Sequence, residues 1–122
     1  MALGYVSLVL HAHLPYVRHP EHPQFFEERW LFEAINECYL PLIGVFDRLL
    51  NDGVPFRIAL SLSPTLTAML EDDLLQRRHL DHTARMIEVA EREIRRLRND
   101  ARFHPLAVGC RDFYRDAARN FE

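Results

Sequence analysis

The start of the chain constrains the fold most, because an apolar run is followed at once by two histidines and a proline. Residues Tyr5–Leu10 are rich in Tyr, Val and Leu, which is typical of a strand covered on both faces in a parallel sheet. Pro15 has no N–H to donate, so we expect regular strand pairing to end near it. His11 and His13 stand two residues apart, which predicts that both imidazoles lie on the same side of the extended backbone.

Helices and a second strand follow this first strand. Residues Val54–Leu62 alternate apolar and polar side chains and predict a strand. Ser63 and Pro64 suit the cap and first position of a helix, and Gly53 suits the positive φ that follows one. Apolar spacings of three and four predict helices over Leu31–Asn51 (kinked or split at Pro41), Pro64–Leu75, Leu80–Arg98 and from His104 onward. This order predicts an α/β fold with parallel strands.

The predicted elements make only part of a sheet. Two parallel strands leave both outer edges open and give helices little surface to cover. The apolar stripe of the last helix still runs at Glu122, with no Gly or Pro to stop it. We therefore interpret residues 1–122 as the first part of a larger α/β fold, and we expect the chain on its own to associate with itself.

Composition argues against several classes of protein. The chain has 122 residues and a formal net charge of −3, which argues against a nucleic-acid-binding protein. No apolar run approaches the length of a membrane span, and no basic segment precedes Tyr5–Leu10, so we expect no membrane anchor and no signal peptide. Cys38 and Cys110 lie far apart without CxxC spacing. We therefore expect a cytoplasmic protein with reduced thiols.

Candidate functional side chains follow the two predicted strands. Ligands of α/β sheets and barrels bind at the carboxyl ends of strands, where His11, His13, Ser61 and Ser63 fall. One interpretation is a pair of hydrogen-bonded histidines that closes a strand. Another is a zinc-dependent hydrolase of the HxH barrel type. Zinc needs three or four ligands, so the others would come from the following loop or from outside the chain.

The turn-rich segment Arg18–Glu28 favours carbohydrate chemistry instead. It is too long for a plain connector, and long loops at this end of a strand are commonly functional. Trp30, the only Trp, suits a sugar platform as well as a core position. Glycosidases hold two carboxylates roughly 5–10 Å apart across the substrate. Glu27 and Glu28 are adjacent, so we interpret them as first-turn helix residues. A non-catalytic carbohydrate-binding or assembly module is a third interpretation.

Specific blocks of residues carry a family resemblance. They are Leu10–Arg18 (LHAHLPYVR), Glu27–Ile35 (EERWLFEAI) and Tyr39–Leu42 (YLPL), with shorter blocks at 63–66, 98–100 and 103–106. Together they resemble the N-terminus of the 1,4-α-glucan branching enzymes of glycoside hydrolase family 57. The resemblance covers nearly the whole chain.

The resemblance implies a fold and a reaction. It implies a (β/α)7 barrel, of which residues 1–122 form the N-terminal portion of the catalytic domain. Enzymes of this family cut and rejoin α-glucan chains with retention, through a covalent glucosyl-enzyme, and use no metal or other cofactor. The implied substrate is an α-glucan such as amylose or a glycogen-like polymer, and the implied pathway is glycogen biosynthesis.

The resemblance also implies roles for individual residues. His11 is similar to the histidine that lines the sugar subsite at the cleavage point, His13 is its neighbour, and Trp30 resembles a loop tryptophan facing the glucan. A second tryptophan found in many members stands earlier in this loop, where this chain has Gln24 or Phe25. The family's nucleophile Glu and acid/base Asp lie on later strands. No catalytic residue is therefore assigned within residues 1–122, and the isolated chain is expected to be inactive.

Overall fold

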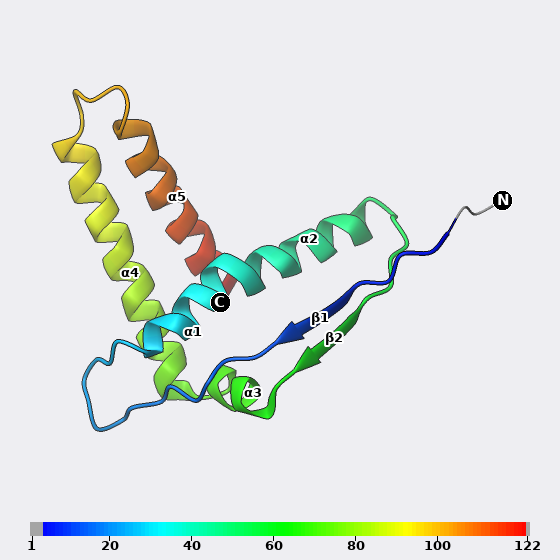
Figure 1. Ribbon diagram of the computed structural model, residues 1–122. Helices are drawn as coiled ribbons and strands as arrows, with labels where there is room; N and C mark the ends of the chain where they lie inside the picture. Colours follow the sequence, from blue (N-terminus) through cyan, green and yellow to red (C-terminus); the bar gives the residue numbers. More distant parts are fainter. Residues whose placement is uncertain (1–3, 122) are drawn as a thin grey trace.

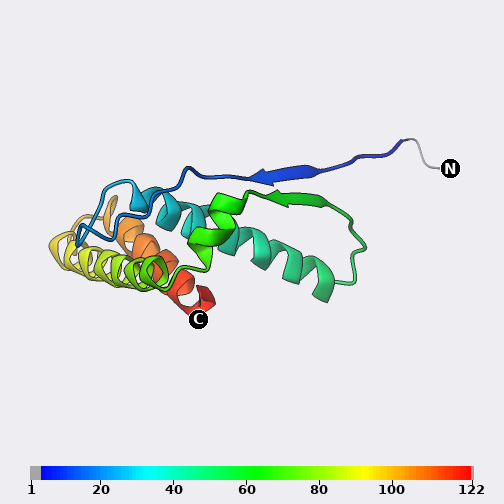
Figure 2. The same ribbon diagram turned by 90° about the horizontal axis from the view of Figure 1, so that it is seen from below.

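The computed structural model describes residues 4–121 and contains two strands and a set of helices. Strands β1 (Val9–Ala12) and β2 (Ala59–Leu62) pair in parallel, with His11 opposite Ser61. The helices lie on one side of this strand pair (Figure 2). The prediction of an α/β fold with parallel strands is confirmed.

The strands differ from the prediction in length and in burial. Pairing covers four residues of each strand, not the whole of Tyr5–Leu10 and Val54–Leu62. Tyr5 and Val6 are 98% and 92% exposed, so the expectation of a strand covered on both faces is wrong for the described residues. The physical reason is that each described strand has one neighbour and helices on one side only.

One long helical stretch follows the loop after β1. It consists of α1 (Glu28–Ala34), a π-helical turn η1 (Ile35–Tyr39) and α2 (Leu40–Asn51). The Leu40 N–H donates to the carbonyl of Ile35, five residues back. The expected interruption at Pro41 thus takes the form of a π turn just before it, which accommodates a residue that cannot donate in an α-helical ladder. Gly53 has φ +66° after α2, as predicted.

Two helix boundaries differ from the prediction. The helix expected to reach Leu75 ends early, as α3 (Pro64–Leu70). The next helix, α4 (Asp73–Arg96), begins well before Leu80. The cause is Asp72, whose carboxylate accepts hydrogen bonds from the Leu74 and Leu75 N–H groups at 2.9 and 3.0 Å and caps α4. The cap at Ser63 is confirmed, since its hydroxyl accepts from the Leu66 N–H.

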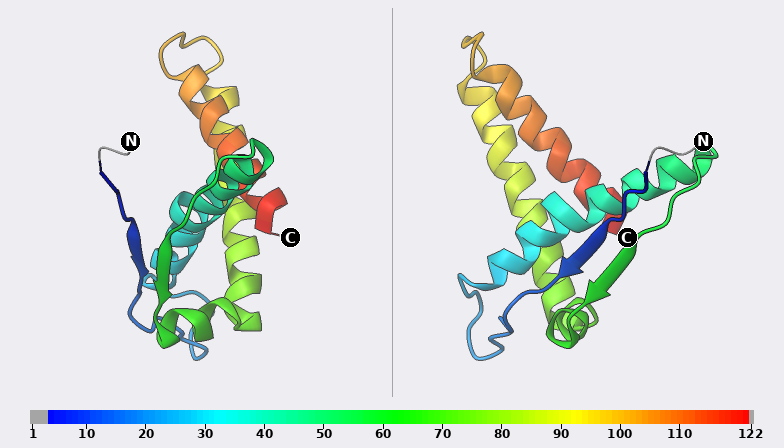
Figure 3. Two further views of the ribbon diagram at one scale, coloured as in Figure 1. Left: turned by 90° about the vertical axis from the view of Figure 1, so that its right-hand side faces the viewer. Right: turned by 45° about the vertical axis from the view of Figure 1, so that its right-hand side comes forward.

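The last helix, α5 (His104–Phe121), begins at the predicted residue. It runs back beside α4 as an antiparallel hairpin (Figures 1 and 3). No helix among residues 4–121 is long and apolar enough to span a bilayer.

The hydrophobic core lies where the loop after β1 meets α1, η1, α3 and the start of α4. Its buried side chains are Val17, Leu31, Phe32, Ile35, Leu66, Met69 and Leu75. The Val17 N–H donates to the Met69 sulfur at 3.3 Å, which ties the loop to α3.

The buried face of α4 carries polar side chains. His79 and Thr83 are fully buried. Leu80 and Ala84, which begin the apolar spacing of the predicted helix Leu80–Arg98, are exposed. Ala90, further along the same apolar spacing, is buried, so the apolar pattern misplaces the buried face only in the first turns of α4.

Candidate functional site

The carboxyl ends of β1 and β2 bring together the side chains that the sequence marked. A hydrogen bond of 2.6 Å joins His11 Nδ1 and Ser61 Oγ across the strand pair, and both residues are exposed. The rings of His11 and His13 lie 6.0 Å apart between centroids with an interplanar angle of 8°. The prediction that both imidazoles share one side is confirmed, and this edge presents two accessible histidines in parallel planes.

Backbone and hydroxyl hydrogen bonds fix the two strand ends relative to each other. The Ser63 N–H donates to the Ala12 carbonyl at 3.0 Å, and the Thr65 hydroxyl donates to the Leu14 carbonyl at 3.1 Å. A further hydrogen bond of 3.1 Å joins the hydroxyls of Ser63 and Thr65. His13 therefore stands between two anchored residues, and the histidine pair sits on a defined backbone.

The residues from the loop and α1 take different positions. Trp30 lies in the first turn of α1 and is 43% exposed, and no hydrogen bond or ring contact joins it to His11 or His13 within residues 4–121. Glu28 opens α1 as expected, yet it is 1% exposed. Glu27 precedes α1 at the N-cap position.

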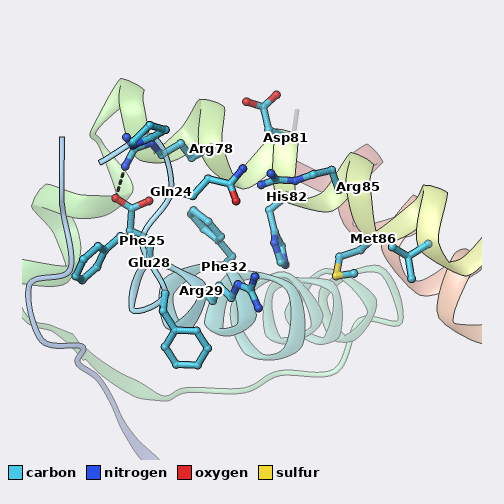
Figure 4. A pocket seen from close by; sticks show the side chains of 13 residues that line it. Gln24, Phe25, Glu28, Arg29, Phe32, Arg78, Asp81, His82, Arg85 and Met86 are labelled. Carbon is cyan, nitrogen blue, oxygen red and sulfur yellow. Dashed lines mark hydrogen bonds and ion pairs between the residues drawn. The ribbon is translucent and has the colours of Figure 1, made fainter. Parts of the chain in front are cut away.

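A buried ion pair holds the loop between β1 and α1. The Arg78 guanidinium of α4 contacts the Glu28 carboxylate (Figure 4). It also donates to the carbonyls of His19, at 3.1 Å, and of His22. The Glu28 carboxylate also accepts from the His19 N–H at 3.2 Å. Sequence reasoning assigned Glu28 to the helix dipole and missed this contact, because its partner lies 50 residues away.

A second anchor joins the same loop to the start of α4. The Arg18 Nε donates to Asp72 at 2.5 Å. Burial alone would raise the pKa of Asp72. The hydrogen bond from the Leu75 N–H and the contact with Arg18 outweigh burial and hold the pKa below its usual value. Asp72 therefore serves as a cap and as an ionised partner at once.

A cavity of about 580 Å³ lies between the loop, α1 and α4, away from the histidine pair (Figure 4). Burial, and then the nearby Arg29 and Arg85 guanidinium groups, lower the pKa of His82. The cavity wall combines aromatic and charged side chains: Pro23, Gln24, Phe25, Phe26, Glu28, Arg29, Phe32, Arg78, Asp81, His82, Arg85, Met86 and Val89. No sequence pattern predicts this cavity, because its two walls come from distant segments.

The described part of the chain offers little for a metal. Among residues 4–121, no three side chains of His, Cys, Asp or Glu gather as metal ligands would. His11 and His13 alone supply two of the three or four ligands that zinc requires.

Comparison with known proteins gives a consistent result. Residues 7–114 match the model of glycosyl hydrolase family 57. A 1,4-alpha-glucan branching enzyme of Thermococcus kodakarensis is 39% identical over 93 residues, which cover 75% of this chain and 14% of the relative. The chain thus spans about a seventh of the length of that curated relative.

Solved structures resemble the fold over nearly all of the chain. A branching enzyme of the same family from Pyrococcus horikoshii gives a TM-score of 0.86 at 32% identity. The match covers 95% of this chain and 22% of the Pyrococcus horikoshii chain. The α-amylase AmyC of Thermotoga maritima gives a TM-score of 0.84 at 40% identity. The match covers 93% of this chain and 22% of the AmyC chain.

Proposed function

This chain belongs to glycosyl hydrolase family 57, and we propose that it is the N-terminal part of a 1,4-α-glucan branching enzyme. The single observation that carries the proposal is the pair of parallel, exposed imidazoles at the carboxyl end of β1, in a chain 39% identical to a branching enzyme. In this proposal residues 1–122 supply the first strands and helices of a catalytic (β/α)7 barrel. The enzyme acts in the cytoplasm, in glycogen biosynthesis.

The proposal assigns substrate contacts to three residues. The accessible imidazoles of His11 and His13 hydrogen-bond hydroxyl groups of the α-glucan at the cleavage point. Trp30, 43% exposed on α1, offers its indole face to a sugar ring of the same chain. Because Trp30 has no contact with the histidines in the described structure, its ring serves a neighbouring subsite and not the cleavage point itself.

The catalytic carboxylates are assigned to later strands of the barrel. A retaining glycosidase needs two carboxyl groups about 5 Å apart on either side of the scissile bond. Within residues 4–121, Glu28 is buried against Arg78 and so cannot reach a substrate. The chain alone is therefore expected to leave amylose unchanged, and activity abolished by Glu27→Gln or Glu28→Gln would contradict this assignment.

The family membership disfavours the zinc-dependent hydrolase as the function of the histidine pair. The proposed reaction proceeds through a glucosyl-enzyme formed on a carboxylate, and it needs no metal or other cofactor. Hydrolysis of α-glucans is the second candidate function, because AmyC, 40% identical to this chain, is an α-amylase. The two candidates share the cleavage step and differ in the acceptor, which is a sugar hydroxyl in one and water in the other.

An assay on the intact enzyme separates the two. Amylose is incubated with enzyme, and the iodine absorbance, the reducing ends and the α-1,6 linkages are followed together. Branching predicts falling iodine absorbance and rising α-1,6 linkages with few new reducing ends. Reducing ends that rise in step with the loss of iodine absorbance, without new linkages, would identify an α-amylase and contradict the branching proposal.

A further inference from the structure

We propose that Ser61 is a positioning residue for His11, and that its hydroxyl sets the imidazole so that Nε2 faces the glucan. The inference rests on the proposed function, since it assumes that His11 contacts the sugar. Ser61 itself touches no substrate in this proposal. It acts through the ring of His11.

The sheet register places the two residues together. His11 and Ser61 are direct partners in the parallel pair of β1 and β2. Paired residues of neighbouring strands project from the same face of the sheet, so the hydroxyl meets the ring without a detour of the backbone. The resulting Nδ1–Oγ distance is 2.6 Å, short enough for a well-formed hydrogen bond.

The hydrogen bond from Ser61 occupies one ring nitrogen of His11 and leaves the other nitrogen available to a ligand. Nδ1 is engaged by Ser61, and no partner within residues 4–121 contacts Nε2. Nδ1 and Nε2 flank Cε1 and their hydrogen-bonding directions diverge, so holding Nδ1 against Ser61 directs Nε2 away from β2. Ser61 thus controls the direction of the ring nitrogen that would contact a sugar hydroxyl.

The environment of His11 leaves the orientation of its ring to the hydrogen bond from Ser61. His11 is exposed, so no wall of packed side chains fixes its ring. The backbone of both strand ends is held by the Ser63 N–H on the Ala12 carbonyl and by the Thr65 hydroxyl on the Leu14 carbonyl. The hydrogen bond from Ser61 is therefore the polar contact that orients the His11 ring on this anchored backbone.

The first test reads the ring directly and needs no activity. The chain is labelled with 15N at histidine, and the Nδ1 and Nε2 shifts of His11 are compared among wild type, Ser61→Ala and Ser61→Thr. We expect Ser61→Ala to change the Nδ1 shift of His11, because the hydrogen bond to Nδ1 is lost. Ser61→Thr keeps the hydroxyl and is expected to restore the shift. Ser7→Ala is the matched control, because Ser7 is an exposed serine of the segment before β1. Identical His11 shifts in wild type and Ser61→Ala would overturn the proposal.

The second test uses the intact enzyme with the same variants. Loss of one orienting hydrogen bond is expected to lower kcat/KM about 3- to 10-fold in Ser61→Ala, with Ser61→Thr recovering most of it. Because Ser61 is exposed, the melting temperature is expected to stay within about 2 °C of wild type. Full activity of Ser61→Ala alongside a reduced His11→Ala would overturn the positioning role. Full activity of His11→Ala would instead contradict the proposed function.

Discussion

At the scale of single residues, the ion pair of Glu28 and Arg78 is the contact on which the loop after β1 depends most. Their side chains are 2% and 14% exposed, so each charge is compensated mainly by the other. Removing one partner leaves the second charge buried and unpaired. Arg78 also binds two loop carbonyls, so its loss frees the backbone between His19 and His22.

Arg78→Met is therefore expected to lower the free energy of unfolding by about 3–5 kcal/mol, as measured by urea denaturation. Arg77→Met is the matched control, because Arg77 is the exposed neighbour of Arg78 on α4, and we expect a change within about 0.5 kcal/mol. A loss below about 1 kcal/mol in Arg78→Met would show that the pair contributes little, as surface pairs do.

A second residue-scale prediction concerns the pH dependence set by His79. His79 is fully buried, shares a 2.8 Å hydrogen bond with Asn36 through Nε2, and contacts the Phe121 ring. Burial, and then the charge of His82, lower the pKa of His79 to about 4. The unfolded chain takes up this proton at a pKa near 6.5, so the unfolded state binds more protons between these two values. The stability from a neutral His79 is complete above pH 6.5 and is lost as the pH falls toward 4.

The lowered pKa of His79 corresponds to roughly 3 kcal/mol of unfolding free energy lost between pH 6.5 and 4. The measurement is the free energy of unfolding against pH for wild type and His79→Gln, which has no proton to gain. The variant is expected to show a flatter profile in this window. Parallel profiles for the two proteins would mean that His79 does not control the acid response.

At the scale of elements, Asp72 decides where α3 ends and α4 begins. Its carboxylate caps α4 through two backbone N–H groups and binds Arg18. Asp72→Ala removes both functions, and we expect a loss of about 1–2 kcal/mol in unfolding free energy. Asp72→Asn keeps an oxygen for the cap and loses the charge, so it is expected to retain most of that stability. Equal losses in the two variants would assign the effect to the Arg18 contact.

The pKa of Asp72 adds a pH dependence to this element. Because the pKa is lowered in the folded state, the stabilisation from the ionised carboxylate is complete above its ordinary pKa. That stabilisation disappears as the pH falls through the lowered value. The free energy of unfolding of Asp72→Asn, measured against pH, should therefore lack this loss of stability in acid. An acid dependence equal to that of wild type would contradict the role given to the Asp72 carboxylate.

The elements also show what the sequence can and cannot predict. The paired histidines, the Ser63 cap and the positive φ of Gly53 depend on local chemistry, and they were predicted correctly. The break at Asp72 was missed, because apolar spacing alone carries a helix through a capping aspartate. The buried face was wrong in the first turns of α4, because His79 and Thr83 are polar and are buried by segments distant in the sequence.

At the scale of the whole molecule, the surface of the described chain is unusually apolar along the strands. Tyr5 and Val6 are almost fully exposed, and Leu8, Val9 and Leu62 are more than half exposed. Such a surface beside an open strand edge favours pairing with another protein surface. In the proposed enzyme the rest of the barrel covers it.

The chain on its own is therefore expected to associate with itself, since no segment among residues 4–121 covers these side chains. Light scattering at several concentrations measures this directly, and the apparent mass is expected to rise with concentration. Introducing Val6→Lys and Val9→Lys should shift the population toward monomer. A monomeric wild-type chain that unfolds cooperatively would contradict the account of the strand surface.

The central claim is that the strand-end histidines form a glucan subsite, and His11→Ala in the intact enzyme tests it most directly. Both kcat and the melting temperature are measured on one preparation. A hydrogen bond strengthened in the transition state contributes roughly 2–4 kcal/mol, so kcat is expected to fall about 30- to 1000-fold. The exposure of His11 predicts a nearly unchanged melting temperature. An unchanged kcat with a lowered melting temperature would make His11 a structural residue and contradict the account.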